Sequence, residues 1–327
     1  MPEGHSIHRL ARQFSDVFAG ERLQVISPQG RFAAGARLID GATLTAARAH
    51  GKHLFLDFGQ DTGTALVLRV HLGLYGAWSF GGDETFRGAS SIGAPRRMGE
   101  TDTFDAPAAP ADTAADTPAH DAGAAPGYAG PPAPVGQVRV RLVSAHGWAD
   151  LRGPSACEVI TPPEAAAVVD RLGPDPLVPG TGPEEFLRRV SGRGVALGQL
   201  LMDQNVLAGV GNIYRAESLF RQGIDPYLPG RALGREAGSA LWQDLVALMN
   251  DGVRDGKIIT TRPEHRATKA GPDGLDGCGQ LAPVWPDNAY YVYQRDGMDC
   301  RVCGTTVRLA EMQARKLFWC PGCQLTG

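Results

Sequence analysis

The stretch DQNVLAGVGNIYRAE, residues 203–217, combines a glycine-rich turn with the beginning of a helix. Gly209 and Gly211 supply the turn, and the residues after it predict a helix over 212–222. The start of such a helix presents unpaired backbone N–H groups and the positive end of a dipole, which together form a ready site for a phosphate. Asn212 is also a good N-cap residue, so simple capping of the helix is the competing interpretation.

Further short helices are predicted on both sides of this stretch, and strands are predicted before them. Residues 4–19 form an amphipathic helix, apolar runs typical of strands follow, and from residue 161 onward the periodicity is helical. The chain is therefore predicted to be α+β, with a β-rich N-terminal domain and a helical domain after it. The remaining predicted helices are 163–172, 183–190, 196–203 and 235–253, and the predicted strands are 22–26, 43–49, 52–58, 64–70 and 138–142.

Length and composition limit the class of protein. The 327 residues are 43% apolar and 20% charged, which suits two domains with packed cores and excludes a fully disordered chain. The sequence has no run of about 20 apolar residues, and its N-terminus lacks the basic and then apolar pattern of a signal peptide. We therefore expect a cytoplasmic protein without a membrane partner.

The formal net charge of -3 is unevenly distributed along the chain. Residues 81–136 are rich in Pro, Ala, Gly, Asp and Thr and carry eight acidic against three basic residues, a balance of -5 that leaves +2 for the rest. That value permits a nucleic-acid partner without arguing for one. The composition of residues 81–136 predicts a disordered loop inserted within the β-rich domain.

Four of the six cysteines form two Cys-x2-Cys pairs near the C-terminus, separated by sixteen residues. This is the spacing of a four-cysteine zinc site, and a site with four protein ligands has no open position, so its zinc is expected to be structural. Two disulfides or a redox-active pair are the alternatives. Cys157 and Cys278 fit no metal spacing. The predicted zinc ligands are Cys300, Cys303, Cys320 and Cys323.

Four motifs, in order along the chain, resemble the formamidopyrimidine-DNA glycosylase/endonuclease VIII family. They are Pro2-Glu3, His50-Gly51-Lys52-His53-Leu54, residues 203–217, and the terminal segment Trp319-Cys320-Pro321-Gly322-Cys323-Gln324. The resemblance implies an N-terminal β-sandwich with flanking helices over 1–160, a helix-two-turn-helix domain over 161–289, a zinc-finger hairpin over 290–327, and damaged DNA as the partner. The start Met1-Pro2-Glu3-Gly4-His5 is similar to the endonuclease VIII branch, whose members usually remove oxidised pyrimidines.

The resemblance places the chemistry at the N-terminus. It implies that Met1 is removed, that the amine of Pro2 attacks C1′ of the damaged nucleotide, and that Glu3 serves as acid and base. A terminal amine, with a reference pKa of about 8, is neutral far more often at neutral pH than a lysine at about 10.4, so it needs little tuning. Without the other motifs, Pro2 would be an ordinary N-terminal residue and Glu3 a partner of the helix dipole.

The other predicted site residues concern DNA. The resemblance assigns phosphate contacts to Lys52, Asn212 and Arg315, and it also assigns to Lys52 a contact with the opening sugar. The alternatives are that Lys52 is simply solvated, that Asn212 only caps the helix, and that Arg315 is an exposed finger residue without a role. Leu74 and Tyr75 match a wedge that fills the gap left by a flipped base, with packing in the core as the alternative. Gly73 departs from the family pattern, which has a polar residue there.

These features predict a monomeric, bifunctional DNA glycosylase and AP lyase of base excision repair in a bacterial cytoplasm, associated with the nucleoid. Structural zinc is the one cofactor implied. Elimination at the β and then the δ position of the Pro2 iminium is expected to leave a one-nucleotide gap. The alternatives are an oxidised-purine glycosylase of the same fold and a catalytically silent zinc-finger protein that binds DNA.

Overall fold

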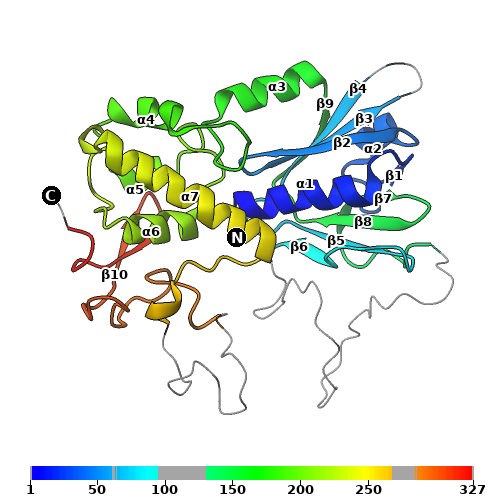
Figure 1. Ribbon diagram of the computed structural model, residues 1–327. Coiled ribbons are helices and arrows are strands. Elements are labelled where there is room, and N and C mark those ends of the chain that lie inside the picture. Colours follow the sequence, from blue (N-terminus) through cyan, green and yellow to red (C-terminus); the bar gives the residue numbers. More distant parts are fainter. Residues whose placement is uncertain are drawn as a thin grey trace, which may run out of the picture. The chain divides into compact units, whose positions relative to one another are not determined.

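The computed structural model describes residues 2–60, 63, 65–94, 130–266, 284 and 286–325. The chain divides into two compact units, residues 1–2 with 6–169 and residues 3–5 with 170–327. Figure 1 labels the helices and strands of both units. Within the described residues, no helix is long and apolar enough to span a membrane.

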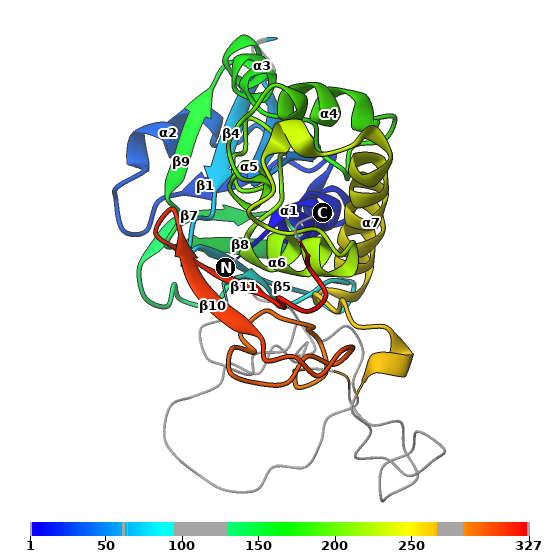
Figure 2. The same cartoon turned by 90° about the vertical axis from the view of Figure 1, so that its left-hand side faces the viewer.

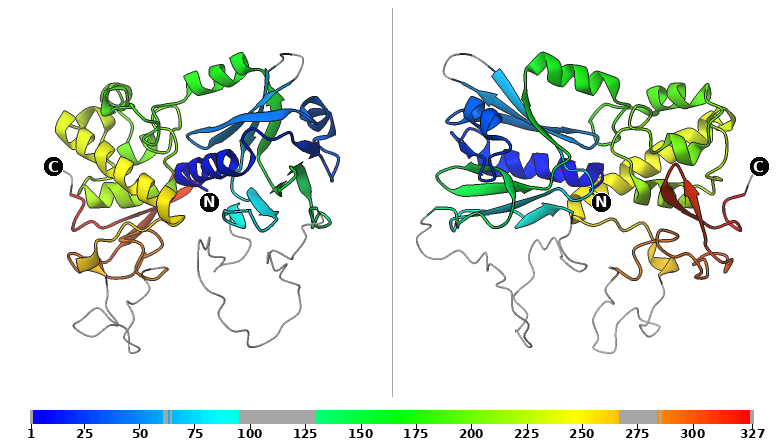
Figure 3. Two further views of the ribbon diagram at one scale, coloured as in Figure 1. Left: turned by 45° about the vertical axis from the view of Figure 1, so that its right-hand side comes forward. Right: turned by 180° about the vertical axis from the view of Figure 1, so that it is seen from behind.

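The first unit is built on two antiparallel sheets, with strand orders β1-β7-β8-β5-β6 and β2-β3-β4-β9. Helix α1, whose first two residues belong to the second unit, runs between the sheets in Figure 1 and in the left view of Figure 3. The helices of this unit are α1 (Gly4–Phe18), α2 (Ala33–Ile39) and α3 (Pro162–Arg171). The strands are β1 (Gln24–Ile26), β2 (Thr43–His50), β3 (His53–Gly59), β4 (Ala65–His71), β5 (Ala77–Gly82), β6 (Ser91–Gly93), β7 (Val138–Val143), β8 (Gly147–Arg152) and β9 (Ala156–Ile160).

One face of α1 supplies the centre of the core between the sheets. Leu10, Phe14 and Phe18 recur at helical spacing and are fully buried. The ring of Phe14 meets Trp78 of β5 edge to face, with 4.8 Å between ring centroids, and Leu56 of β3 belongs to the same cluster. Each such side chain contributes about 2 kcal/mol by burial, so this helix joins the two sheets. The predicted helix over 4–19 is confirmed.

Strands β5, β8 and β9 were not predicted from the sequence. Strands β5 and β8 are buried on most positions of both faces, because α1 and neighbouring side chains cover them. Without one solvated face, a strand has no polar and apolar alternation to detect.

The ends of several strands lie in one row across the five-stranded sheet. Arg152 of β8 pairs with Val138 of β7 and with Ala77 of β5, and Ala77 pairs with Gly93 of β6. The turn before β5, the residues after β6 and the residues before β7 therefore all leave the sheet at the same end.

The N-terminal part of the predicted disordered insert, 81–136, is structured, so the prediction is wrong there. Strand β5 continues to Gly82, and β6 follows at residues 91–93. The side-chain amide of Gln13 donates to the carbonyl oxygen of Ala89 and accepts from its N–H, both at 2.9 Å. Because Gln13 lies far away in the sequence, the composition of the insert itself carries no sign of this contact.

The C-terminal part of the insert, which we call the stem (residues 130–137), is also held in place. Arg141 Nη1 donates to the carbonyl oxygen of Pro132 (2.7 Å), and Arg152 Nε donates to that of Val135 (2.8 Å). Both guanidinium groups also donate to the buried carboxylate of Asp150. Residues 95–129 of the insert lie outside the described residues.

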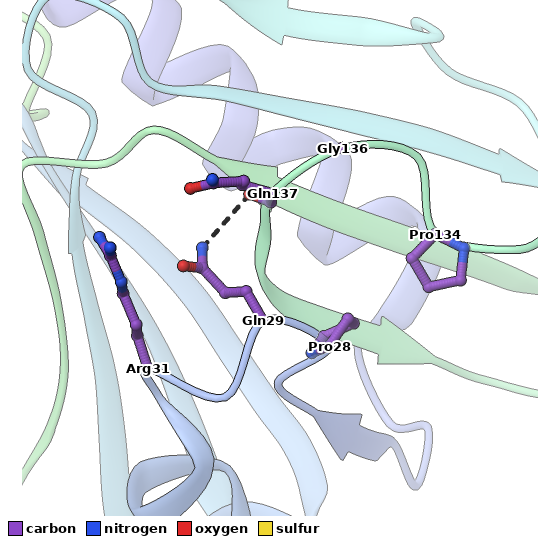
Figure 4. Close-up of a pocket in the computed structure, with 6 residues that line it drawn as sticks. All are labelled: Pro28, Gln29, Arg31, Pro134, Gly136 and Gln137. Carbon is purple, nitrogen blue, oxygen red and sulfur yellow. Dashed lines mark hydrogen bonds between the residues drawn. The ribbon is translucent and has the colours of Figure 1, made fainter.

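A hollow next to the stem is bordered by the loop that precedes α2 (Figure 4). Gln29 Nε2 donates to the carbonyl oxygen of Gln137 at 3.3 Å across it, and Arg31 lines its other side. The stem is therefore held by hydrogen bonds to its backbone carbonyl groups, while residues 132–137 remain exposed.

The second unit contains a group of helices and a two-stranded hairpin. Its core gathers Phe186, Tyr214, Leu219, Leu241 and Trp242. The helical predictions are confirmed within one or two residues, except that the one over 196–203 is a single turn. The elements are α4 (Pro183–Ser191), α5 (Leu197–Leu200), α6 (Asn212–Arg221), η1 (Gly230–Ala232), α7 (Arg235–Asp255), η2 (Pro263–His265), β10 (Arg308–Met312) and β11 (Arg315–Trp319).

Candidate active site

Glu3 occupies the N-terminus of α6. The side chain is fully buried, and its carboxylate accepts hydrogen bonds from the backbone N–H groups of Gly211 (2.9 Å) and Ile213 (2.8 Å). These N–H groups have no acceptor within the helix, and the helix dipole favours a negative charge at this end. The expectation that the backbone N–H groups here form a phosphate site is wrong, because Glu3 already accepts from them. Pro2, also buried, is one peptide bond away.

The glycines of the 203–217 stretch let the N-terminus approach α6. Gly4 N–H donates to the carbonyl oxygen of Gly209 at 2.8 Å. A Cβ atom on Gly4 would lie 2.8 Å from Cα of Gly209, and one on Gly211 would lie 2.5 Å from Cδ of Glu3. A side chain at either position would push the N-terminus away from the helix, so this contact explains the glycine-rich turn.

Asn212 is not the N-cap of α6, because Gly211 holds that position. Instead, Asn212 Nδ2 donates to the backbone oxygen of Lys316 in β11 at 3.0 Å. Arg215 donates to the same oxygen at 2.7 Å and to the side-chain oxygen of Asn212. The capping interpretation of Asn212 is therefore wrong, and its side chain connects α6 to the hairpin.

Arg215 lies within residues 203–217 but was given no role from the sequence. It is 1% exposed, and burial lowers its pKa to about 10, which still leaves it charged at neutral pH. Its position three residues after Asn212, on the same face of the helix, is the signal that could have linked the two.

Arg315 begins β11 directly after a tight turn. Gln313 and Ala314 have positive φ angles of 51° and 55°, as a two-residue type I′ hairpin turn requires. Met312 pairs with Arg315 at the tip, and Figure 2 shows the hairpin beside α6. Within the second unit, the hairpin therefore brings the exposed Arg315 next to the residue whose backbone binds Asn212.

The four cysteine sulfurs of the two Cys-x2-Cys pairs lie within 4.8 Å of one another. Sγ of Cys300 is 3.8 Å from that of Cys323, and Sγ of Cys303 is 3.4 Å from that of Cys320. These separations are too long for disulfides, whose sulfurs are about 2.05 Å apart. Thiolates about 2.3 Å from a tetrahedral zinc would be about 3.8 Å apart, so the residues fit a metal ion.

Glu217 is another buried carboxylate, and the sequence indicated no role for it. It accepts from the backbone N–H groups of residues 291–293, each at 2.8 Å, and from the hydroxyl of Thr260. Burial raises its pKa, although these hydrogen bonds oppose the shift. It thus shapes the segment that leads to the cysteines, where the ring of Tyr293 packs on Phe318 of β11.

In the first unit, the predicted DNA-contact residues lie on two turns. Lys52 is half-buried in the turn between β2 and β3. Leu74 and Tyr75, in the turn before β5, are 49% and 81% exposed, so the alternative that they belong to the core is wrong. A Cβ atom on Gly73 (φ +69°) would lie 2.9 Å from Cβ of Ser155, which explains why a larger residue is missing at this position.

Two family models match the chain: "Formamidopyrimidine-DNA glycosylase N-terminal domain" over residues 1–121 and "Formamidopyrimidine-DNA glycosylase H2TH domain" over residues 172–263. Endonuclease 8 1 of Mycobacterium tuberculosis is 43% identical over 324 residues, covering 99% of this chain and 100% of that protein. Formamidopyrimidine-DNA glycosylase of Laribacter hongkongensis is 35% identical over 163 residues, covering 50% of this chain and 55% of that protein.

Solved structures show the same fold. A complex of Lactococcus lactis Fpg with DNA that contains N7-benzyl-Fapy-dG matches with a TM-score of 0.66 at 16% identity. A complex of that protein with DNA that contains an abasic site matches with a TM-score of 0.65, also at 16% identity. Each match covers 99% of this chain and 100% of the other.

Proposed function

Because the chain belongs to the formamidopyrimidine-DNA glycosylase family, whose members are DNA glycosylases with AP lyase activity, we propose that it removes oxidised pyrimidines from damaged DNA through a Schiff base of Pro2. A role in base excision repair follows from membership of the family. The pyrimidine preference is supported by the start Met1-Pro2-Glu3-Gly4-His5 and by the full-length similarity to Endonuclease 8 1. We propose that the protein acts as a monomer.

The observation that carries the proposal is the buried Glu3 carboxylate held at the start of α6. In the proposed reaction, the amine of Pro2 attacks C1′ while the bond from C1′ to the base breaks, and the base leaves with a proton. Glu3 lies one residue from the amine and receives or returns protons as the sugar opens. Loss of the C2′ proton then expels the 3′ phosphate, and a second elimination expels the 5′ phosphate.

The proposed phosphate contacts use side chains, because the backbone N–H groups of Gly211 and Ile213 are taken. Asn212 Nδ2 donates to the backbone oxygen of Lys316, and the Asn212 side chain also hydrogen-bonds to Tyr293, so in the proposed complex a phosphate oxygen replaces Tyr293 as its partner. The exposed guanidinium of Arg315 can bind a phosphate with two parallel hydrogen bonds. We assign Lys52 of the first unit to the same task, and the exposed Leu74 and Tyr75 to the wedge that replaces the flipped base.

We infer that the four-cysteine site holds structural zinc. Four thiolates suit zinc and leave no position for a substrate. The residues that would hold it are Cys300, Cys303, Cys320 and Cys323. The ion would fix the base of the hairpin and thereby the position of Arg315.

Borohydride trapping on abasic-site DNA tests the Schiff base. Protein that has lost Met1 should form a covalent adduct with the DNA, whereas Pro2→Gly protein or protein that retains Met1 should form none. Absence of an adduct with correctly processed protein would refute the proposal and favour a silent DNA-binding protein.

A panel of duplexes containing thymine glycol, dihydrouracil or 8-oxoguanine tests the substrate. We expect faster excision of the two pyrimidines. Faster excision of 8-oxoguanine would instead favour the oxidised-purine activity, which the half-length similarity to formamidopyrimidine-DNA glycosylases keeps as the second candidate. Gel analysis of the cleaved strand separates β-elimination from β,δ-elimination.

A further inference from the structure

Three histidines form a row across the four-stranded sheet of the first unit. His50 of β2 pairs with His53 of β3, and His53 pairs with His71 of β4. Directly paired residues of antiparallel strands point to the same face of a sheet. The rings of His53 and His71 have centroids 4.9 Å apart. Lys52 immediately precedes His53, so the row begins beside the proposed phosphate contact.

The row also ends beside the proposed wedge. The turn with Leu74 and Tyr75 follows directly after His71. Ser155 closes the same end of the sheet, because its N–H donates to the carbonyl oxygen of His71 at 2.9 Å. Along this end of the sheet, His53 therefore lies between Lys52 and the turn that carries the wedge.

The contacts of His53 determine which ring nitrogen carries its proton. Arg69 Nε donates to His53 Nδ1 at 3.3 Å, and Arg69 is held in turn by an ion pair with Glu158. Since a guanidinium only donates, Nδ1 must be the acceptor. The proton of the neutral ring is therefore on Nε2.

The surroundings of His53 keep it neutral. Burial, together with the charges of His71, Arg69 and His50, lowers its pKa to about 3. The pKa of His71 is lowered as well, by burial and by the charges of Lys52 and Arg69, and its Nδ1 shares a hydrogen bond of 2.7 Å with Ser155 Oγ. Among the described residues, the charged or titratable groups that face His53 are His50, His71, Arg69 and, through Arg69, Glu158.

We propose that His53 donates a hydrogen bond from Nε2–H to a phosphate oxygen of the damaged strand, next to the phosphate contact of Lys52, with Arg69 and Glu158 as positioning residues. The inference rests on the proposed DNA-binding function. A neutral donor gives direction where the flexible ammonium of Lys52 gives charge. Unlike a histidinium, this donor does not lose its proton as the pH rises through neutrality.

The test measures binding to a duplex with a tetrahydrofuran abasic analogue, which the enzyme cannot cleave. His53→Phe removes the donor and should weaken binding about tenfold, because a hydrogen bond to a charged group contributes that much. His53→Gln keeps an amide donor near the position of Nε2 and should remain within about threefold of the wild type. His146→Phe, in the turn between β7 and β8 where His146 pairs with Asp83, is the matched control and should bind as the wild type does.

A scan of single methylphosphonate substitutions locates the contact. At one phosphate near the lesion, the neutral substitution should weaken binding by the wild type but add nothing to the loss in His53→Phe. This non-additivity is the coupling between His53 and that phosphate, and it should stay constant from pH 6 to pH 8.5. Equal binding by wild type and His53→Phe would overturn the inference. So would weaker binding by His53→Phe that shows no coupling to any phosphate, or a coupling that disappears as the pH rises through 6.5.

The two proposals fail in different ways. Trapping by wild-type protein reports on the Pro2 chemistry and does not depend on His53 making a phosphate contact. If the wild type forms the trapped adduct and the phosphate scan shows no coupling, the inference about His53 alone is wrong. If the wild type forms no adduct, the proposed lyase is wrong, whereas the binding scan still decides the role of His53.

Discussion

Replacing Gly211 with alanine should disable the proposed active site without replacing a residue that takes part in the reaction. The new Cβ atom would lie 2.5 Å from Cδ and 2.7 Å from Oε1 of Glu3, so the carboxylate has to move by about 1 Å to reach ordinary contact. That movement breaks its hydrogen bonds from Gly211 and Ile213. Each is a bond to a charged group and contributes about 1.5 kcal/mol or more, so we expect a loss of about 3 kcal/mol in the free energy of unfolding.

The effect on activity should be larger than the effect on binding. A displacement of about 1 Å in a reacting geometry costs about 100-fold in rate, and Pro2 moves with Glu3 because they are adjacent. The assay is the single-turnover rate of borohydride trapping on abasic-site DNA, measured at a temperature where the variant is folded. Binding to the uncleavable analogue should change less than tenfold, because the proposed phosphate contacts are made by other side chains and not by the displaced carboxylate of Glu3.

Gly192→Ala is the matched control for this substitution. The residue follows α4 with a φ of -89°, and a Cβ atom there would have no atom within 4 Å. It should therefore unfold and react as the wild type does. Identical trapping rates and melting curves for Gly211→Ala and Gly192→Ala would refute the argument that Glu3 is held by a close approach to α6.

Three further predictions concern other parts of the molecule. A histidine whose pKa is lower in the folded than in the unfolded state stabilises the fold above pH 6.5, and that stability is lost as the pH falls. In urea unfolding between pH 7 and pH 5, the wild type should therefore lose about 2 kcal/mol more of its free energy of unfolding than His53→Phe does. Equal pH profiles of the two proteins would contradict this. Cys320→Ser should lower the zinc content from one ion per chain. It should also weaken binding to abasic-site DNA at least tenfold, because the metal no longer holds the base of the hairpin that carries Arg315. Full binding of DNA by metal-free protein would count against this prediction. Residues 95–129 carry six acidic and two basic residues, and replacing them with a short Gly/Ser linker should leave the melting temperature unchanged and strengthen non-specific DNA binding at low salt. Deleting 81–136 should instead destabilise the fold, because it removes β6 and the stem. Equal melting temperatures of the two deletion variants would show that the contacts of β6 and the stem contribute nothing.

Glu3 changes the expected division of labour at α6. A helix N-terminus of this kind usually serves a phosphate, but here the chain supplies its own carboxylate. The helix dipole and the backbone N–H groups are thereby used to hold a proposed acid and base, and DNA recognition is left to side chains. This explains why the stretch needs glycine at 209 and 211 as well as a polar residue at 212.

Several features depend only on neighbours along the chain and can be recognised in the sequence alone. Helical periodicity predicted α1, α3, α4, α6 and α7, and the cysteine spacing predicted a metal site whose four sulfurs do gather. The resemblance of the ordered motifs identified the family. Each of these signals is contained within about twenty residues or repeated at a regular interval, which is why a single sequence reveals it.

Contacts between distant groups, in contrast, become visible only once the chain is folded. Glu3 binds an N–H group 208 residues away, Gly73 is confined by Ser155, and Arg69 sets the proton of His53. The same holds for the stem, which composition alone placed in a disordered loop although Arg141 and Arg152 bind its carbonyl groups. A hydrogen bond between remote residues depends on how strands register and helices pack, and the local pattern of either partner carries no record of the other.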